Sequence, residues 1–251
     1  MIDQTTPRNI LEEEAANDNP VAFLYIARHS AHGTNGFAED KVKKVEFYQK
    51  GAALADQGSL VALYCQAVCY FMGFGVDKDE QEANRWFQKA AEQGFALAQL
   101  ALGRAYTLGK GVDADQSTAF KWYQKAAEQR HSEAQYCLGV CYEFGEGVDM
   151  DNKEVIKWYQ KAAKQGPPEA QCRLGICYEF GKGVDKDEKE AVKWYQKATK
   201  QGHPEAQCWL GDCYRFGEGV DKDDAKAITW FCKAAKQGHK GALQRLSWEL
   251  E

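Results

Sequence analysis

The chain has 251 residues, of which 44% are hydrophobic, 12% aromatic and 27% charged, with a formal net charge of −5. This apolar and aromatic content excludes a disordered chain, and the acidic balance argues against a protein that clamps nucleic-acid phosphates. The longest apolar run, residues 21–27, is too short to span a bilayer. The N-terminus has neither the basic nor the apolar region of a Sec signal peptide, so we expect no integral membrane segment and no Sec export.

The first 58 residues are less regular than the rest of the chain. Residues 1–19 include the run Glu12–Glu14 and predict an acidic N-terminal cap, with a helix over 8–16. Residues 20–58 predict a degenerate first repeat, with helices over 21–31 and 41–56. Its segment Phe47–Lys50 matches the segment Trp86–Lys89 of the following repeat.

Residues 59–238 contain five regular repeats of 36 residues. Self-similarity at a fixed period is the sequence signature of repeat architectures. Equivalent positions of the repeats, 36 residues apart, are called a column. The columns that keep one residue type include Trp86, Trp122, Trp158, Trp194 and Trp230; Gly73, Gly109, Gly145, Gly181 and Gly217; and Ala98, Ala134, Ala170, Ala206 and Ala242.

Each repeat is predicted to form two helices. In the repeat after Pro167, Ala170, Leu174 and Tyr178 recur at the spacing of one helical face. Gly181 ends that helix, because glycine accepts a left-handed cap, and Asp187 is placed to cap the second helix.

Neither helix buries its apolar stripe alone, so the pairs must stack. Residues 239–251 predict a C-terminal capping helix. The sequence therefore predicts an all-α, right-handed α/α solenoid of about six helix-pair repeats with terminal capping helices.

The repeat reads Ala-x3-Leu-Gly-x2-Tyr-x2-Gly-x-Gly-Val, then Asp, then Ala-x2-Trp-x3-Ala-Ala. This pattern resembles the SEL-one-like repeat family, a relative of the tetratricopeptide repeat, over residues 58–246 in full and 20–57 weakly. The resemblance implies an adaptor or scaffold, since members are found in bacterial signalling, in pathogen–host contact and in endoplasmic-reticulum quality control. A cysteine-rich bacterial branch credited with beta-lactamase activity keeps a hydrolase as an alternative.

Nine cysteines leave three interpretations open. Cys69, Cys141, Cys177 and Cys213 share one column between the Leu and Tyr columns, which favours small apolar side chains in the core. Neighbours in this column are one repeat apart, beyond the reach of a disulfide. In the resembling cysteine-rich branch a first-helix Cys pairs with one at the end of the second helix, where this chain has none. A metal or redox sensor using the Cys-x3-Cys pairs, or Cys232 as an exposed thiol, is the third interpretation.

The acidic loops and the histidines favour no catalytic centre. The Asp column 79, 115, 151, 187 and 223 predicts N-caps, because the loops lack the ligand pattern of an EF-hand. Catalysis needs a nucleophile, a base and an orienting group in one pocket, and recurring residues are framework residues. We expect no enzyme and no cofactor.

Variable first-helix columns are the candidate partner-binding surface. They are predicted to face solvent, on the concave side, and to bind a peptide or helix, unless the superhelix turns them against the next repeat. The candidates are Tyr64, Val68, Phe71, Leu100, Arg104, Thr107, Tyr136, Val140, Glu143, Ile176, Glu179, Asp212 and Arg215. Two second-helix columns predict a solvated face, with weak contact to an acidic surface or lipid headgroups as the alternative. They are Lys89, Lys125, Lys161, Lys197 and Lys233, and Gln93, Gln129, Gln165, Gln201 and Gln237.

These observations predict a non-enzymatic adaptor that binds a protein or peptide partner as a monomer or weak dimer. By analogy with the resembling family, it is expected to be a bacterial effector acting on host proteins, either cytoplasmic or translocated without a Sec signal. The segment Trp248–Glu251 is acidic with an apolar neighbour, as some non-Sec translocation signals are.

Overall fold

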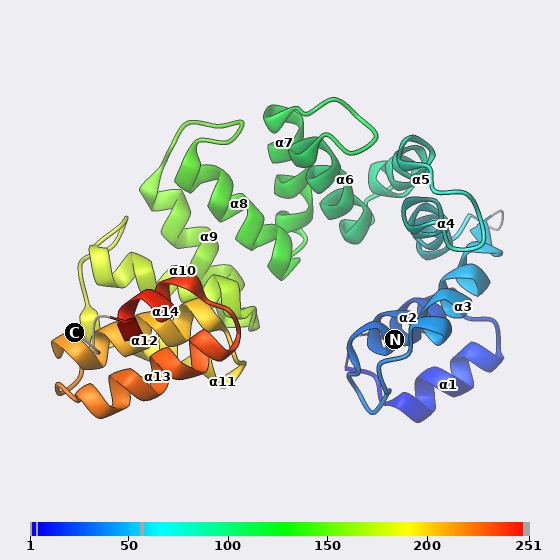
Figure 1. Cartoon of the computed structure of the whole chain (residues 1–251). Helices are drawn as coiled ribbons and strands as arrows, with labels where there is room; N and C mark the ends of the chain where they lie inside the picture. Colours follow the sequence, from blue (N-terminus) through cyan, green and yellow to red (C-terminus); the bar gives the residue numbers. More distant parts are fainter. Residues whose placement is uncertain (1, 4, 56–57, 248–251) are drawn as a thin grey trace. The chain divides into compact units, whose positions relative to one another are not determined.

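The computed structural model describes residues 2–3, 5–55 and 58–247 and contains two compact units, residues 1–129 and 130–251. The described residues form helices joined by turns and loops, with no strand among them. Figure 1 shows the helices in chain order. The first unit holds α1 (Arg8–Ala16), α2 (Pro20–His32), α3 (Lys41–Ala52), α4 (Leu60–Met72), α5 (Glu80–Glu92), α6 (Ala96–Leu108) and α7 (Gln116–Glu128); the second holds α8 (Ser132–Phe144), α9 (Asn152–Gln165), α10 (Pro168–Phe180), α11 (Glu188–Lys200), α12 (Pro204–Phe216), α13 (Asp224–Lys236) and α14 (Lys240–Ser247). The acidic segment at 248–251 lies outside the described residues.

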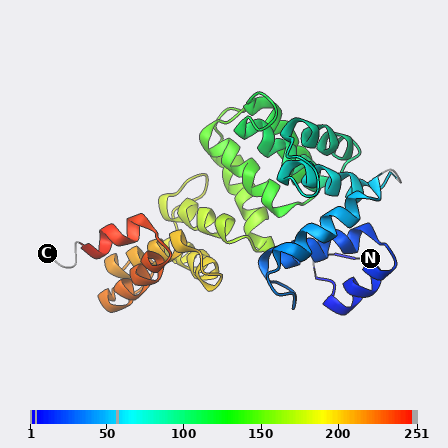
Figure 2. The ribbon, with the colours of Figure 1, turned by 45° about the vertical axis from the view of Figure 1, so that its right-hand side comes forward.

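Helices pack mainly against their neighbours in the sequence. Within the second unit α10 contacts both α9 and α11, and α12, α13 and α14 lie side by side in two views (Figures 1 and 2). Equivalent first helices start 36 residues apart, as Ser132, Pro168 and Pro204 do. The predicted all-α solenoid of helix pairs is confirmed.

The predicted helix ends are also confirmed. Asp151 adopts an extended conformation, and its carboxylate accepts hydrogen bonds from the backbone N–H groups of Lys153 and Glu154 at 2.8 and 3.3 Å. Asp79 and Asp115 also accept from two backbone N–H groups, and Asp187 and Asp223 each accept from one, three residues later. Gly181 ends α10 with φ of +67°, a left-handed conformation that glycine adopts without the steric penalty of a Cβ.

The core of each repeat depends on small residues between aromatic ones. Ala170, Ala198 and Tyr195 are all fully buried. A Cβ added to Gly175 would lie 2.5 Å from the Tyr195 ring, so the first helix needs glycine where the second-helix aromatic ring packs on its backbone. The Leu-Gly pair of the repeat is therefore a contact point between the two helices.

A row of glutamines joins neighbouring repeats. Gln201, the C-cap of α11, donates from Nε2 to Oε1 of the buried Gln171 at 3.0 Å. Gln171 in turn donates to the Ala163 carbonyl of the preceding repeat at 3.3 Å. The same glutamine pairs recur at 129–99, 165–135 and 237–207. The glutamine column is exposed, as expected, but it is also part of the framework.

Candidate functional site

The thirteen candidate residues lie in both units and differ widely in exposure. Six lie on α4 and α6 of the first unit, and seven lie on α8, α10 and α12 of the second. Arg104 is exposed, and seven others are half-buried. The prediction that these columns face solvent is wrong for five buried residues: Val68, Leu100, Ile176, Glu179 and Asp212.

The buried candidates face neighbouring helices. Ile176 packs in a cluster with Val192 and Leu210, which belong to the second helix and to the next repeat. The half-buried Tyr64 has its ring centroid 5.5 Å from those of Phe87 and Phe95. The spacing of residues along one helix shows which side lies opposite its apolar stripe. It does not show whether a neighbouring helix covers that side. A role of these columns in partner binding stays a prediction.

Paired residues 16 positions apart connect the two helices of each repeat. Tyr159 donates from its hydroxyl to Glu143 Oε2 at 2.7 Å, and Thr107 Oγ1 lies 3.0 Å from the Tyr123 hydroxyl. Where the first helix has no acceptor, the second helix has phenylalanine: Phe71 faces Phe87, and Arg215 lies 5.8 Å from the Phe231 ring. The chain therefore changes both members of the pair together.

The Glu179–Tyr195 pair belongs to this series and is buried. Tyr195 donates a hydrogen bond from its hydroxyl to Glu179. Burial raises the pKa of the Glu179 carboxyl, and the Tyr195 hydrogen bond opposes that shift. Burial and the neighbouring Glu179 charge raise the Tyr195 pKa, so the phenol stays protonated as a donor.

A groove of about 350 Å³ in the second unit is the candidate functional site. Phe180 ends α10 and Trp209 lies on α12, with their rings edge to face at a centroid distance of 5.8 Å. Phe216 ends α12 and is 65% exposed, and Phe180 is 55% exposed. The charged residues around these rings are Glu179, Lys186, Asp212, Arg215, Glu218 and Arg245.

The groove brings three predicted residues together: Glu179, Asp212 and Arg215. Asp212 accepts two hydrogen bonds of 2.7 Å from Arg245 Nε, and Arg245 Nη2 lies 2.6 Å from Asp212 Oδ2. This contact joins α14 to α12. Arg215 lies over the Phe216 ring at 6.0 Å.

Sequence reasoning missed the aromatic residues of the groove. Phe180 and Phe216 belong to a column, with Met72, Leu108 and Phe144, that is apolar and exposed in every regular repeat. This column directly precedes the capping glycine and lies outside the buried stripe. An apolar residue at such a position in every repeat is the sequence signal for an exposed apolar surface. Trp209 stands where the other repeats have Cys, Ala or Arg, so it breaks the pattern.

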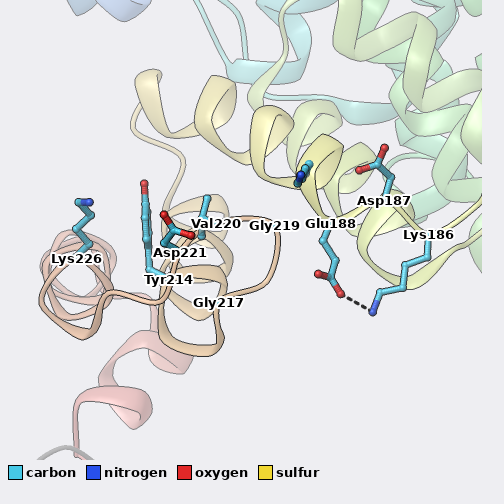
Figure 3. A pocket seen from close by; sticks show the side chains of 10 residues that line it. Lys186, Asp187, Glu188, Tyr214, Gly217, Gly219, Val220, Asp221 and Lys226 are labelled. Atoms are coloured by element: carbon cyan, nitrogen blue, oxygen red, sulfur yellow. Dashed lines mark ion pairs between the residues drawn. The ribbon is translucent and has the colours of Figure 1, made fainter.

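A larger, open depression of about 950 Å³ lies between the start of α11 and the loop after α12 (Figure 3). Its lining alternates in charge, and Lys186 forms an ion pair of 2.8 Å with Glu188. A Cβ on Gly219 would collide with the Glu188 carbonyl, so this loop packs on the preceding second helix. The lining has both charges, and the same loop contact recurs in other repeats. We therefore assign this depression to the packing of the repeats and not to ligand binding.

Comparisons with known proteins identify the repeat. A family model described as Sel1 repeat matches residues 62–95, 96–131, 132–167, 168–203 and 204–239. The chain belongs to the Sel1-repeat family. Proteins built from Sel1 repeats generally mediate protein–protein interaction, and the solenoid is typically a non-enzymatic scaffold.

Two solved Sel1-type structures are similar to this chain. A protective antigen present in uropathogenic Escherichia coli strains, which has an SLR fold, is 31% identical with a TM-score of 0.74. The match covers 99% of this Sel1-repeat chain and 51% of the antigen, so the chain spans about half of the antigen's length. A Sel1 repeat protein from Oxalobacter formigenes is 37% identical with a TM-score of 0.72, covering 78% of this chain and 82% of that one. A comparison with curated proteins gave no significant match.

All nine cysteines of this Sel1-repeat chain are free thiols. The predicted core column is confirmed, because Cys69, Cys141, Cys177 and Cys213 are all buried. Burial raises the pKa of the Cys141 and Cys177 thiols to about 12, which disfavours the reactive thiolate. Cys232 is half-buried, not exposed as expected. Among residues 2–3, 5–55 and 58–247, no three His, Cys, Asp or Glu side chains cluster in a way that holds a metal ion.

Three histidines cap first helices, a role that their sequence context did not predict. The Nδ1 atoms of His131, His203 and His239 accept hydrogen bonds from the backbone N–H three residues later, at 3.4, 3.2 and 3.2 Å. An accepting Nδ1 carries no proton, so the cap requires the neutral ring. Burial lowers the pKa of His203.

Acidification is expected to destabilise the second unit through His203. Because the folded-state pKa is lowered, the stabilisation is fully present above the unfolded pKa of about 6.5 and is lost as the pH falls through the folded pKa. The slope for this proton is at most about 1.4 kcal/mol per pH unit. The surrounding charges are Glu169, Glu205, Arg173 and His239.

Urea unfolding between pH 7.5 and 5 measures this dependence. The matched variant is His203→Asn, since asparagine is a strong N-cap that does not titrate. We expect the variant to show a shallower loss of stability than the wild type. Identical slopes in the two proteins would show that His203 does not titrate on unfolding.

Proposed function

We propose that this chain is a non-enzymatic adaptor that binds a protein partner through the groove of its second unit. This groove surrounds Phe180, Trp209 and Phe216 and is called the first-helix groove below. The observation that supports this most is the exposure of two phenylalanines, Phe180 and Phe216, beside the half-buried Trp209. Exposed apolar surface of this kind, surrounded by charged groups, is typical of interaction sites. Large aromatic residues and arginine also dominate the binding energy of most protein interfaces.

The groove suits a peptide segment with a bulky apolar side chain and charged neighbours. The apolar side chain would pack on the three aromatic rings, and the flanking charges would meet Lys186, Arg215 or Glu218 at the rim. Glu179 and Asp212 already have protein donors in Tyr195 and Arg245, so they shape the groove rather than bind the partner directly. Of the thirteen predicted residues, this proposal therefore keeps the three that line the groove: Glu179, Asp212 and Arg215.

A bacterial effector role is the finer part of this proposal. It is supported by the similarity to the E. coli protective antigen, which this chain matches over about half of the antigen's length. A protein that acts inside a host cell should bind a host protein and ignore bacterial ones. The alternative functions, a beta-lactamase-like hydrolase or a thiol-based redox or metal sensor, are less well supported, because the described cysteines are mostly buried with raised pKa values.

A matched pair of variants tests the groove. Phe180→Ala/Phe216→Ala removes the exposed aromatic rings from the groove, whereas Met72→Ala/Leu108→Ala removes exposed apolar side chains from the same column in the first unit. Partners are captured from bacterial and eukaryotic lysates, identified, and titrated against each protein. We expect the groove variant to raise the Kd at least about tenfold, since two anchor truncations remove more than about 1.4 kcal/mol.

The control variant is expected to bind the partner as the wild type does. Equal loss in both variants would contradict the groove, and equal binding by all three proteins would move the contact elsewhere. A partner found in eukaryotic lysate alone would support the effector role, and a bacterial partner would contradict it.

A further inference from the structure

The second helices of the second unit carry an unusually high positive charge. Helices α9, α11 and α13 contain eleven lysines, no arginine and four acidic residues, a net charge of +7 in a chain whose total is −5. All eleven lysines are exposed. By contrast, α5 of the first unit has three acidic and two basic residues. The lysines are Lys153, Lys157, Lys161, Lys164, Lys189, Lys193, Lys197, Lys200, Lys226, Lys233 and Lys236, and together they form the lysine face.

The lysine face points away from the first helices. The opposite stripes of α9, α11 and α13, which include Tyr159, Tyr195 and Phe231, are fully buried against the first helices. Lys161 and Lys197 lie over Trp158 and Trp194, with Nζ 3.9 and 3.6 Å from the ring centroids. Lys233 has the same contact with Trp230 at 4.0 Å. These contacts hold the lysine stems along the helices and cover the indole rings.

The unbalanced charge is concentrated in the last two turns of each helix. Near the helix starts, Lys157 and Lys193 form ion pairs of 2.7 Å with Glu154 and Glu190. Near the ends, the described residues provide no acidic partner for the six lysines of two columns, which are Lys161, Lys164, Lys197, Lys200, Lys233 and Lys236.

One column changes sign between the two units. Lys164, Lys200 and Lys236 stand where α5 and α7 of the first unit have Glu92 and Glu128. A cation near a helix C-terminus is favoured by the helix dipole, but the two glutamates show that this fold does not require one. The positive charge of this column is therefore specific to the second unit and is not a requirement of the fold.

We propose that the lysine face binds the surface of an anionic lipid bilayer. Lysine is a compact, strongly hydrated point charge that attracts diffuse negative charge, whereas specific bidentate recognition of carboxylate or phosphate uses arginine. Each lysine near an anionic membrane surface contributes about 1 kcal/mol of attraction. The charge is spread over three helices, so a planar surface meets more of it than a single extended peptide does. The indole rings lie under lysines and are not free for base stacking, which disfavours single-stranded nucleic acid.

The charge distribution also sets an orientation. The remainder of the chain carries a net charge of −12, so an anionic surface attracts the lysine face and repels the rest. None of the residues that line the first-helix groove belongs to the lysine face. Membrane attachment would thus leave the groove open to a partner. Among the described residues, none of the helices has the length and apolar character needed to cross a bilayer.

Vesicle co-sedimentation of the full chain tests the proposal. Vesicles of phosphatidylcholine alone are compared with vesicles that also contain phosphatidylserine, at low and high ionic strength. The face variant is Lys164→Glu/Lys200→Glu/Lys236→Glu, which copies the glutamates that the first unit has in this column. The control variant is Lys41→Glu/Lys121→Glu/Lys240→Glu, which changes three exposed lysines on separate helices and alters the net charge equally.

We expect the wild type to bind the phosphatidylserine vesicles, to ignore the neutral ones, and to dissociate as salt screens the attraction. The face variant is expected to bind at least about 100-fold more weakly, from the loss of three lysine contributions. The control should keep most of the binding, and circular dichroism should show that all three proteins are equally helical.

Three outcomes would overturn the proposal. The first is a wild type that does not bind the phosphatidylserine vesicles at low ionic strength. The second is an equal loss of binding in the face and control variants, which would reflect net charge rather than this surface. The third is tighter binding to a DNA duplex than to the vesicles, which would assign the lysine face to nucleic acid.

Discussion

Replacing Arg245 with methionine is expected to lower the free energy of unfolding by about 3 kcal/mol. Removing one partner of a buried ion pair costs about 3–5 kcal/mol, because the remaining charge stays buried without compensation. The lower end applies here, since the Asp212 side chain is 9% exposed but that of Arg245 is 26% exposed. Urea unfolding followed by circular dichroism measures the loss, and hydrogen exchange in α14 reports whether that helix detaches from α12.

The double variant Asp212→Val/Arg245→Met provides the matched control. Val68 and Val140 occupy the Asp212 column in other repeats, so valine suits this position of the first helix. Replacing both members of a buried ion pair with apolar residues is often neutral. We expect the double variant to recover most of the stability. A double variant as unstable as Arg245→Met would show that the loss comes from packing and not from the unpaired Asp212 carboxylate.

The sequence was sufficient to predict features that are local to one helix. An aspartate marks where each second helix of the regular repeats begins, and a glycine marks where each first helix ends; the structure confirms both at every regular repeat. The buried alanine and cysteine columns were predictable for the same reason, since a period of 3.6 residues defines one face. These predictions needed no knowledge of how the helices pack together.

Features that depend on the next repeat were not predictable from a single helix. Ile176 and Asp212 lie off the main apolar stripe, yet both are buried, because neighbouring helices cover them. Phe180 lies off the stripe too, but it stays 55% exposed because it stands at the end of its helix. Comparison of columns between the repeats gives part of this information, as the paired changes at residues 143–159 and 71–87 show.

The lysine face and part of the groove result from departures from the repeat. Trp209 and Asp212 are unlike the residues of their columns in the other repeats, and the lysines at 164, 200 and 236 replace glutamates. Constant columns stabilise the solenoid, so they are not free to recognise a partner. Positions that change between repeats while remaining accessible distinguish the second unit from the first. The proposed bilayer contact depends on such positions, whereas the groove combines one of them, Trp209, with Phe180 and Phe216, whose column is apolar and exposed in every regular repeat.

Replacing Tyr195 with phenylalanine is expected to destabilise the protein by about 2 kcal/mol at pH 7. The variant removes a hydroxyl that donates to the buried Glu179, and a buried charged acceptor without a donor costs about 1–3 kcal/mol or more. The loss should shrink at pH 5. The Glu179 pKa is raised by burial and rises further when the hydrogen bond that opposes this shift is removed. A carboxyl with a raised folded-state pKa favours folding below its unfolded pKa, and this contribution is lost as the pH rises through the folded pKa.

The first regular repeat supplies the control, because Phe71 and Phe87 form the equivalent pair without any polar group. Glu179→Phe/Tyr195→Phe transfers that pair to the fourth repeat and leaves no buried carboxylate. We expect its free energy of unfolding, measured with urea at pH 5 and pH 7, to depend less on pH than that of Tyr195→Phe. If Tyr195→Phe is equally destabilised at both pH values, the Glu179 carboxylate is not what the Tyr195 hydroxyl stabilises. The pairing at 16 residues would then reflect aromatic packing on Gly175 alone.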